Sequence, residues 1–529
     1  MPKQQLPVDE SIESANSHIP NGWAESLLPE VVYFQEGPGL RKYQYREEGV
    51  PFLNIRTIVD GKVDLSLCRF LDTKEVETKY QHFLLEPGDI ICSTSGTIGK
   101  TAVISKSDLP LMLNTSIIRF RPHDELYLDS RFIHIYLKSR YFLEQALGAS
   151  TGTAQINVGP THLKQMHFLL PPRNEQARIV TVIESLQQRS ARARALLTEV
   201  RPALENLRQS ILQAAFSGRL TADWRAKTPD VETAHRLLAR IRTERRQRWE
   251  TDQLANFEAK GKKPPKNWKD KYKEKNLVTA ASSVLKNETL PDNWVLSPIG
   301  ELCDFQQGMQ IAKSTRYTEP LEGRLPILRT VSYRNNFSDD VHYVDVAEDS
   351  LIANEDDIIL SRTGTVGEVL TGVKGVFHNN SFRVNFDSEA IDKEYMRYLL
   401  MSPIVQQHIV ESSGRTAQPD LTHKAFNPCP FPLAPVKEQR VLVERIDIAL
   451  NVVLETSQLV GAVDLALEQL DQSILSKAFK GELVPQDPND EPASELLDRI
   501  RATREKEAAE KKATKKKKSK KKVTQKRKS

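Results

Sequence analysis

The sequence predicts an α+β protein in which two mixed-sheet domains are joined by two long antiparallel coiled-coil helices, the whole being a tandem duplication. The first observation is a repeat, since LRQSILQAAFSGRL at 207–220 returns as LDQSILSKAFKGEL at 470–483. The second is a heptad pattern of apolar residues that begins before each copy of the repeat and ends within it. The third is a series of short apolar segments, broken by Gly, Pro and Asp, that precedes each helix.

The heptad pattern predicts two helices that pair with each other. Apolar residues alternate in steps of four and three, and the pattern recurs in register 263 residues later. Each helix therefore carries one apolar stripe, and the simplest partner for each stripe is the other. The stripe comprises Ile179, Ile183, Leu186, Ser190, Ala193, Leu197, Val200, Leu204, Leu207, Ile211 and Ala214, and then Leu442, Ile446, Ala449, Val453, Thr456, Val460, Val463, Leu467, Leu470, Ile474 and Lys477.

The two helices have predicted ends and one predicted irregularity. Asn174 is placed to cap the first helix, and Gly218 and Gly481 follow the last apolar residues of the two helices. Pro202 lies inside the first helix and predicts a kink or an interruption there. At ~1.5 Å per residue, a helix of about 43 residues spans roughly 65 Å.

The segments before each helix predict sheet domains that open on a turn. IPNGW at 19–23 and LPDNW at 290–294 each combine turn residues with a Trp that is expected to pack in a core. Helical stretches are expected at 130–147 and near 392–409. The predicted strands are PFLNIR at 51–56, GDIIC at 88–92, AVIS at 102–105 and SIIRFR at 116–121, followed in the second half by PILR at 326–329, DDIIL at 356–360 and SFRVNF at 381–386.

Positive charge is concentrated in two segments. The formal net charge is +5, yet 511–529 holds twelve basic residues and no acid, and 235–276 holds fourteen basic and six acidic residues. The rest of the chain is therefore strongly acidic, with a net charge of −15. Two interpretations of the basic segments stay open, namely solubility and a sequence-independent attraction to phosphates.

The composition is typical of a protein of the reducing cytoplasm. No run of about 18 apolar residues predicts a membrane span, and the N-terminus lacks the basic-then-apolar pattern of a secretory signal. Cys68, Cys92, Cys303 and Cys429 are scattered without a CxxC pair. The sequence therefore predicts no disulfide framework and a cytoplasmic location.

A glycine loop after a predicted strand is the most informative repeat in the sheet domains. DIICSTSGTIGK at 89–100 aligns with DIILSRTGTVGE at 357–368. The first copy is similar to the end of a phosphate-binding P-loop, but Thr94 stands where that motif needs Gly, and Glu368 replaces Lys100 in the second copy. The pattern therefore favours a tight turn that projects Ser, Thr or Arg side chains outward.

The chain lacks a duplicated set of catalytic residues. NPCPF at 427–431 is similar to the Asn-Pro-Pro-aromatic motif of DNA amino-methyltransferases, but no glycine-rich cofactor turn accompanies it. The letters of a restriction-nuclease metal site at 229–230 and 258–260 fall in a charged stretch without strands, whereas such a site needs its acids on adjacent strands. His162 and His423 recur without an acid or Ser partner at a fixed spacing. We therefore expect no catalytic residue, cofactor site or metal site in this chain.

The ordered motifs resemble one family, the specificity subunit of type I DNA restriction-modification enzymes. The resemblance covers Ile19 to about Thr503, and the polar N-terminal extension and the Lys-rich insertion at 235–276 depart from it. It rests on the two opening turns, the GTIG and GTVG loops, TAQ at 153–155 and 416–418, the PPRNEQ and APVKEQ helix entries at 171–176 and 434–439, and the repeated SIL..AF.G.L sequence followed by LTADWRAKTPD at 220–230.

The resemblance implies a non-catalytic DNA-recognition subunit. Each sheet domain would be a target recognition domain that reads one half of a bipartite, asymmetric site in double-stranded DNA. The long helices would be spacer regions that dock two modification subunits, which methylate adenine N6. Two restriction subunits would add ATP-driven translocation and cleavage. S-adenosylmethionine, ATP and Mg would act in those partners. A spacer of at most ~65 Å would place the half-sites fewer than roughly 20 base pairs apart, at ~3.4 Å per base pair.

The implied organisation divides the chain into eight segments. They are a disordered N-terminal extension at 1–18, the first recognition domain at 19–172, the first spacer helix at 173–220, a charged helical and basic linker at 221–288, the second recognition domain at 289–434, the second spacer helix at 435–484, a short C-terminal helix at 485–510 and a disordered Lys-rich tail at 511–529.

Base reading is expected from polar side chains on the strand-end loops, because Arg, Lys, Asn and Gln match base edges in the major groove. A residue shared by both halves can serve the fold, so a position that differs, such as Thr94 against Arg362, is the better specificity candidate. The candidates are Arg56, Thr57, Thr94, Ser95, Thr97, Lys100, Asn114, Ser116, Gln155 and Asn157 in the first half, and Arg329, Thr330, Arg362, Thr363, Thr365, Asn379, Asn380, Arg415 and Gln418 in the second.

Two alternatives to this function stay open at the level of sequence. One is a recognition subunit that serves a fused methyltransferase-nuclease. The other is a coiled-coil scaffold whose globular domains bind proteins.

Overall fold

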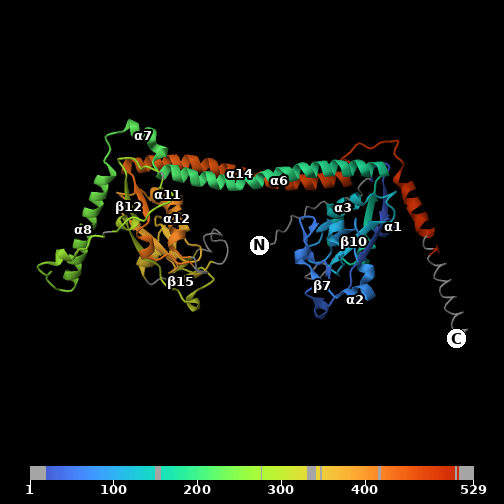
Figure 1. The fold of residues 1–529 in the computed structure, drawn as a ribbon, viewed down its shortest axis with the longest axis horizontal. Helices are drawn as coiled ribbons and strands as arrows, with labels where there is room; N and C mark the ends of the chain where they lie inside the picture. Colours follow the sequence, from blue (N-terminus) through green and yellow to red (C-terminus); the bar gives the residue numbers. More distant parts are fainter. Residues whose placement is uncertain are drawn as a thin grey trace. The chain divides into compact units, whose positions relative to one another are not determined.

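The computed structural model of the chain describes residues 19–148, 157–275, 277–286, 288–329, 341–345, 348–414, 419–506 and 509–510. The chain divides into two compact units, 1–197 with 462–529 and 198–461. Each unit contains one sheet domain and part of both long helices (Figure 1). We call the two sheet domains the first head, residues 24–170, and the second head, residues 295–433.

The first head is built on a four-stranded antiparallel sheet with the order β2-β10-β8-β9, and α3 and α4 share its core. Phe120, Phe132 and Tyr136 are fully buried in this core. The elements are β1 (Ala24–Leu27), α1 (Leu28–Val31), β2 (Val32–Glu36), η2 (Lys42–Gln44), β3 (Tyr45–Arg46), β4 (Val50–Phe52), η3 (Ile55–Thr57), β5 (Ile58–Val59), β6 (Lys62–Val63), η4 (Leu65–Leu67), β7 (Arg69–Leu71), α2 (Thr73–Glu75), η5 (Val76–Tyr80), η6 (Gln81–Phe83), β8 (Ile90–Ser93), β9 (Thr101–Val103), η7 (Lys106–Asp108), β10 (Ile117–Pro122), α3 (Ser130–Lys138), α4 (Arg140–Gly148), α5 (Pro160–Leu163) and β11 (His167–Leu170).

The second head repeats this plan, with the sheet order β13-β20-β17-β18 and the helices α11 and α12 in its core. A second sheet contains the parallel pair β14 and β19, so this head is mixed as predicted. The elements are β12 (Val295–Pro298), α9 (Ile299–Leu302), β13 (Cys303–Gln307), η10 (Lys313–Thr315), β14 (Arg324–Leu328), β15 (Tyr343–Asp345), η11 (Asp349–Leu351), β16 (Ile352–Ala353), β17 (Ile359–Ser361), β18 (Val369–Leu370), β19 (Gly375–Phe377), β20 (Ser381–Phe386), α11 (Lys393–Met401), α12 (Pro403–Ser412), α13 (His423–Phe426) and β21 (Pro430–Leu433).

The repeated Glu-Gln pair at the start of each long helix ties that helix to its head. Gln176 is fully buried, and its side chain accepts the Asp129 N–H at 2.9 Å and donates to the Pro171 carbonyl at 3.0 Å. Gln439 makes the matching bonds to the Asp392 N–H at 2.8 Å and the Ala434 carbonyl at 2.9 Å. A buried amide that loses these partners is destabilising, which explains why the pair appears in both copies.

The long helices are α6 (Arg173–Phe216) and α14 (Val436–Phe479), each of 44 residues. In the first unit, Ile183 near the start of α6 shares a core with Ile474 near the end of α14. In the second unit, Leu212 near the end of α6 shares a core with Ile446 near the start of α14. These pairings confirm that the helices run antiparallel.

The predicted seam is wrong at Leu207 and Leu470, which are each 48% exposed, and at Val463, which is 37% exposed. Leu212 and Leu475, which the heptad pattern omits, are buried instead. An α-helix drifts by ~20° per heptad relative to a 3.5-residue repeat, so the inward face shifts by about one position toward the end of each helix. Lys477, the last position of the pattern, is also exposed.

Two predictions about the first helix need correction. Of the kink or interruption predicted at Pro202, the interruption is wrong, because α6 continues to Phe216. Asn174 is not the cap, because the helix already begins at Arg173 and the Asn174 side chain donates to Asp490 at 3.0 Å. The prediction of glycine after each helix is confirmed, since Gly218 and Gly481 have φ of 78° and 70°.

Each head also receives a short helix that sequence comparison did not pair. These docking helices are the first half of α8 (Ala234–Ala259) and a helix over 493–506. Leu237 is fully buried in the core of the second head, and Leu496 is buried in that of the first. The start of each helix donates a backbone N–H to the opening turn of its head, from Ala234 to the Asn293 carbonyl and from Ala493 to the Gly22 carbonyl.

The ion pairs of the docking helices are duplicated too. Arg242 lies 2.6 Å from Glu301 on the second head, and Arg501 lies 2.7 Å from Glu30 on the first. The connection into α8 runs through η8 (Arg219–Thr221) and α7 (Ala222–Lys227), and α8 is followed by η9 (Trp268–Lys271). The duplicated module is therefore a head, part of the helix pair and a docking helix.

Candidate nucleic-acid interface

The glycine loop of the first head connects β8 to β9 and is closed by hydrogen bonds to Ser93. The Ser93 carbonyl accepts the Gly99 N–H at 3.0 Å, and its hydroxyl donates to the Thr97 carbonyl at 2.5 Å. Gly96 and Gly99 have positive φ values of 68° and 88°, and a Cβ on Gly99 would lie 2.7 Å from the Leu143 side chain. The loop therefore requires glycine for both its backbone conformation and its close packing.

This loop gathers three of the segments singled out in the sequence. The Thr94 N–H donates to the Ser116 carbonyl at 3.1 Å, and the Thr94 carbonyl accepts the Val158 N–H at 2.8 Å. Ser95 forms a β-bridge with Asn157. The candidates around 94–97, 114–116 and 157 thus form one cluster at the end of the main sheet.

The candidates of the first head differ in exposure. Arg56, Thr97, Lys100 and Asn157 are exposed, and Ser95, Asn114 and Ser116 are half-buried. Thr57 and Thr94 are fully buried.

The Thr57 hydroxyl donates to the Asn54 carbonyl at 2.6 Å and therefore closes the short turn of η3. The Thr94 side chain lies under the loop, and its backbone holds neighbouring segments together. Both residues stabilise the loops from below in this structure.

The second head has the same loop with different polar side chains. The Ser361 carbonyl accepts the Gly367 N–H at 2.9 Å, and the Arg362 N–H donates to the Asn380 carbonyl at 2.8 Å. At the position of Thr94, the Arg362 guanidinium donates to both carboxylate oxygens of Asp420 at 2.8 Å. This bidentate geometry orients the guanidinium plane at the loop surface.

The remaining described candidates of the second head surround this pair. Thr363 forms a β-bridge with Asp420, and the Thr365 hydroxyl donates to Glu368 at 3.0 Å. Asn379 and Asn380 are half-buried on the segment before β20. Four candidates, Gln155, Thr330, Arg415 and Gln418, lie outside the described residues.

A pair of Arg-His contacts lies beside the loop and was missed by the sequence reasoning. Arg329 Nη2 lies 2.9 Å from His342 Nδ1, and Arg316 Nη2 lies 3.3 Å from His378 Nε2. Burial, together with the two arginines, lowers the pKa of His378. Of these four residues only Arg329 was predicted, because single His and Arg residues on separate loops carry no spacing signal.

Asp420 was also missed, although it faces Arg362 directly. It lies 58 residues further along the chain, and only the fold brings the two together. In the first head, the segment that contacts the loop in the same way is the one that contains Val158. It has no acidic residue at the position that corresponds to Asp420.

The titratable groups outside the loops serve the fold. Burial raises the pKa of Cys92 to about 12 and that of Cys68 to about 11, which keeps both thiols protonated and weakly nucleophilic. The His162 ring accepts the Gly159 N–H at 3.3 Å, and the His423 ring packs edge-on against Phe382. Within the described residues, no group of three or more His, Cys, Asp or Glu is placed to hold a metal ion.

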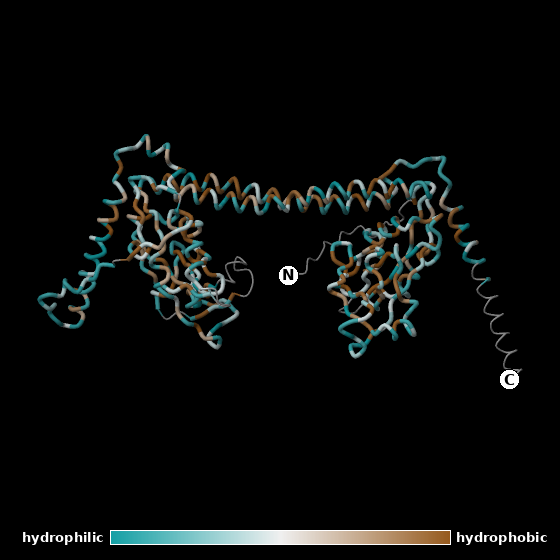
Figure 2. The backbone as a smooth tube through the Cα atoms, in the orientation of Figure 1, coloured by the Kyte–Doolittle hydropathy of each residue, from teal (hydrophilic) through white to brown (hydrophobic). Residues whose placement is uncertain are grey.

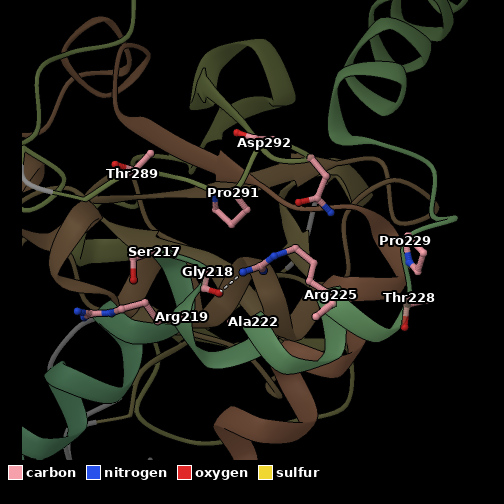
Figure 3. Close-up of a pocket in the computed structure, with 12 residues that line it drawn as sticks. Ser217, Gly218, Arg219, Ala222, Arg225, Thr228, Pro229, Thr289, Pro291 and Asp292 are labelled. Carbon is pink, nitrogen blue, oxygen red and sulfur yellow. Dashed lines mark hydrogen bonds between the residues drawn. The ribbon is translucent and has the colours of Figure 1, made fainter.

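An open pocket of about 710 Å³ lies in the second unit, where the end of α6 meets α7 and the opening turn of the second head (Figure 3). Its central side chain is Arg225, which donates to the Gly218 carbonyl at 2.7 Å and pairs with buried Glu438. A Cβ on Gly218 would lie 2.5 Å from the Pro291 ring. These contacts join helix, turn and head, and the charges of Arg225 and Glu438 are paired with each other.

The family described as the type I restriction modification DNA specificity domain matches residues 20–200 and 291–459. The chain belongs to this family. Each matched range of this specificity-domain protein comprises one head and the first part of the long helix that follows it. The duplication seen in the sequence is therefore a duplication of the family's domain.

Relatives and a solved structure agree with this membership. The chain is 22% identical over 508 residues to the type I restriction enzyme EcoBI specificity subunit of Escherichia coli, covering 92% of the chain and 93% of that subunit. It is 22% identical over 512 residues to the StySPI specificity subunit of Salmonella potsdam, with 92% and 96% covered. A chain from a structure titled for the assembly and conformational transition of the type I R-M system shares the fold, with a TM-score of 0.58, 18% identity, and 88% and 100% covered.

Proposed function

We propose that the chain is the DNA sequence-recognition subunit of a type I restriction-modification complex. The observation that carries this proposal is the match of the family's DNA specificity domain to both halves of the chain. The duplicated glycine loops support it, because the same backbone presents different side chains in the two heads. Each head then reads one half of a bipartite and asymmetric target.

Exposed side chains of the first loop cluster and the half-buried Arg362 of the second are the proposed base readers. In the first head these are Arg56, Thr97, Lys100 and Asn157. In the second head Arg362 is the leading candidate, since an oriented guanidinium fits the two acceptors of guanine in the major groove. Phosphate contacts from neighbouring basic residues would set the register without reading sequence.

The outward face of α14 is proposed to dock a helix of a modification subunit. In the second unit, Ile448, Val452 and Leu459 are 63%, 58% and 63% exposed, at steps of four and seven residues. This is heptad spacing on the side away from the seam, which suits a partner helix. The corresponding positions on α6 are Ser185, Arg189 and Leu196, of which only Leu196 is apolar, so the complete stripe belongs to α14.

By length and composition alone, α14 could cross a membrane. The exposed apolar stripe contributes to this apolar composition. In the described structure α14 is paired with α6 and packed against the heads, and Figure 2 shows hydrophobic residues spaced along it. We propose a cytoplasmic protein whose apolar helix face is covered by protein partners. A set of Ile448→Gln, Val452→Gln and Leu459→Gln is expected to abolish co-purification of the modification subunit, and Ser185→Gln is the control.

Catalysis is proposed to reside in the partners. Two modification subunits would supply S-adenosylmethionine and adenine N6 methylation, and two restriction subunits would supply ATP- and Mg-dependent cleavage. The chain's own share is to choose the site and to hold the partners there. The length of the helix pair is proposed to fix the number of base pairs between the half-sites.

Methylome sequencing tests the function. Cells that express the complete system should carry N6-methyladenine in a split motif that disappears when this gene is deleted. Replacing residues 290–433 with the same region of a relative should alter one half of the motif and leave the other unchanged. A change in both halves, or in neither, would contradict the assignment of one half-site to each head. An unchanged methylome after deletion would favour a protein-binding scaffold.

A further inference from the structure

The second unit carries a projecting arm that has no part in its head's core. The arm comprises the second half of α8 from Trp249 to Ala259 and the segment 260–275 that folds back along it. The buried residues of α8 end at Ile241, so the docking role of the helix is complete before the arm begins. Figure 2 shows the arm as predominantly hydrophilic.

An aromatic cluster gives the arm a fold of its own. The Trp249 and Trp268 rings stack with centroids 5.9 Å apart. The Tyr272 ring centroid lies 5.4 Å from that of Trp249, and the Phe257 ring centroid lies 6.3 Å from that of Trp268. Trp268 is only 9% exposed, although all its neighbours from 258 to 267 are exposed. Aromatic pairs of this kind add to the free energy of burial, so the arm is held as a hairpin.

Ion pairs anchor the arm at both ends. Lys275 lies 2.7 Å from Asp304 at the start of β13, and Lys269 lies 2.7 Å from Glu250 on α8. Arg248, just before the arm, pairs with Asp387 after β20. The hairpin is therefore attached to the second head at its base, and the Lys269–Glu250 pair joins the returning segment to the start of the arm.

The lysines that remain are concentrated on the returning segment. Residues 260–275 contain eight lysines and two acids, a net charge of +6. Two of the lysines are used by the ion pairs above. The other six are exposed, with no protein partner among the described contacts: Lys260, Lys262, Lys263, Lys266, Lys271 and Lys273.

This charge is unusual for the chain, because outside 235–276 and the tail at 511–529 the protein carries a net charge of −15. The structure also relates the two basic segments. Each follows a docking helix, since 260–275 comes after α8 and 511–529 comes after the helix over 493–506. The same placement after equivalent helices, in an otherwise acidic protein, indicates a shared ligand of high negative charge density.

We propose that the arm binds the phosphate backbone of double-stranded DNA without reading sequence, and so extends the contact of the second head beyond its half-site. This inference rests on the proposed function, because it assumes that DNA lies on the second head. Lysine ammonium groups on a flexible stem make point contacts with phosphates, and each contact releases counterions. The aromatic frame keeps the six ammonium groups close together, which raises the local positive potential above that of a free tail.

The test uses the full-length chain and a set of five substitutions, Lys262→Gln, Lys263→Gln, Lys266→Gln, Lys271→Gln and Lys273→Gln. The matched control replaces the same five lysines by arginine and so keeps the charge. Binding to a random 40-base-pair duplex and to the methylome-defined target duplex is measured by fluorescence anisotropy over a series of salt concentrations. Circular dichroism melting of each variant checks that the fold is retained.

Each lost phosphate contact lowers the slope of log affinity against log salt by about 0.9, so the neutral set is expected to lower it by roughly two to four. The affinity for both duplexes should fall by the same factor, and the arginine set should behave like the wild-type chain. An unchanged slope in the neutral set would overturn the proposal. So would a loss confined to the target duplex, because that would mean base reading.

The outcomes also separate this inference from the function on which it rests. If the wild-type chain prefers its target duplex but the neutral set keeps the wild-type slope, only the DNA-binding role of the arm is excluded. If the wild-type chain shows no preference for any methylated motif, the recognition function itself fails. Should the neutral set keep its DNA affinity and lose a co-purifying subunit, the arm binds an acidic protein surface and the DNA proposal is overturned. Repeating the series with 511–529 deleted should preserve the arm's contribution to the slope.

Discussion

The two heads close their glycine loops with the same backbone hydrogen bonds, yet the loops present different chemistry. In the first head Thr94 is buried beneath the loop, whereas in the second Arg362 is half-buried in a bidentate pair with Asp420. The docking helices behave in the same way, because their Leu and Arg contacts are equivalent, while the arm follows the docking helix of the second unit. Backbone and core are duplicated, and the polar surface is what has diverged. A bipartite and asymmetric target would require this division.

The largest expected effect tests the equivalence of the docking helices. Leu496→Ala and Leu237→Ala each remove a buried side chain, and such truncations cost about 2–5 kcal/mol of the free energy of unfolding. Leu496→Ala should loosen only the first unit and Leu237→Ala only the second, as measured by segment-resolved hydrogen exchange. Leu254→Ala, at an exposed site on α8, is the control and should change the free energy by less than about 0.5 kcal/mol. If Leu496→Ala loosened neither head, the helix over 493–506 would not be part of the first unit.

A second difference between the heads concerns pH. His134 on α3 bonds to Thr101 at 2.9 Å, and burial followed by repulsion from Lys138 lowers its pKa to about 4. The unfolded chain has a His pKa of about 6.5, so between pH ~6.5 and ~4 the unfolded state binds more protons. The first unit should therefore lose up to ~3 kcal/mol of stability as the pH falls through this window.

The matched variant for this pH effect is His134→Gln, which removes the titrating ring. Its first unit should show a flatter dependence of the unfolding free energy on pH between 6.5 and 4, measured by urea unfolding. The equivalent position in the second head, 263 residues later, is Arg397, which pairs with Glu394 at 2.5 Å and does not titrate in this range. An identical pH dependence in the wild-type chain and the variant would show that His134 is not the source.

The difference between the two loops can be tested at one pair of equivalent positions, Thr94 and Arg362. Arg362→Ala should weaken binding of the target duplex by about 1–3 kcal/mol and relax sequence preference only in the second half-site. Thr94→Val in the first head should leave both half-sites unchanged, since the Thr94 side chain is buried. Competition binding with single-base variants of the target measures both effects. Relaxation in the first half-site by Arg362→Ala would contradict the separation of the two readers.

The smallest expected effect concerns the helix seam. Leu207→Ala and Leu470→Ala should each change the free energy of unfolding by less than about 0.5 kcal/mol, because these side chains are half exposed. Leu212→Ala and Leu475→Ala, on the same helices, should each cost about 2–5 kcal/mol. Thermal unfolding of the four variants makes the comparison. Equal losses of unfolding free energy in the two pairs would instead support the seam predicted from the heptad pattern.

The sequence by itself determined the duplication, the long antiparallel helices, the opening turns, the glycine loops and the family. These features rest on local rules, since heptad spacing, turn residues and repeated motifs are visible along the chain. The repeated Glu-Gln pair was visible as well, although its purpose in tying helix to head appears only in the bonds of Gln176 and Gln439.

The tertiary structure alone decided which members of those patterns face inward, outward or each other. Leu207 and Leu470 leave the seam because helical drift accumulates over many turns. Arg362 meets Asp420, and Arg501 meets Glu30, across 58 and 471 residues of chain. The two docking helices are recognised as equivalent by the cores that they enter. The lysines of the arm are brought together by an aromatic cluster whose members have no regular spacing along the chain. Such contacts depend on distances in space, and no periodicity along the chain encodes them.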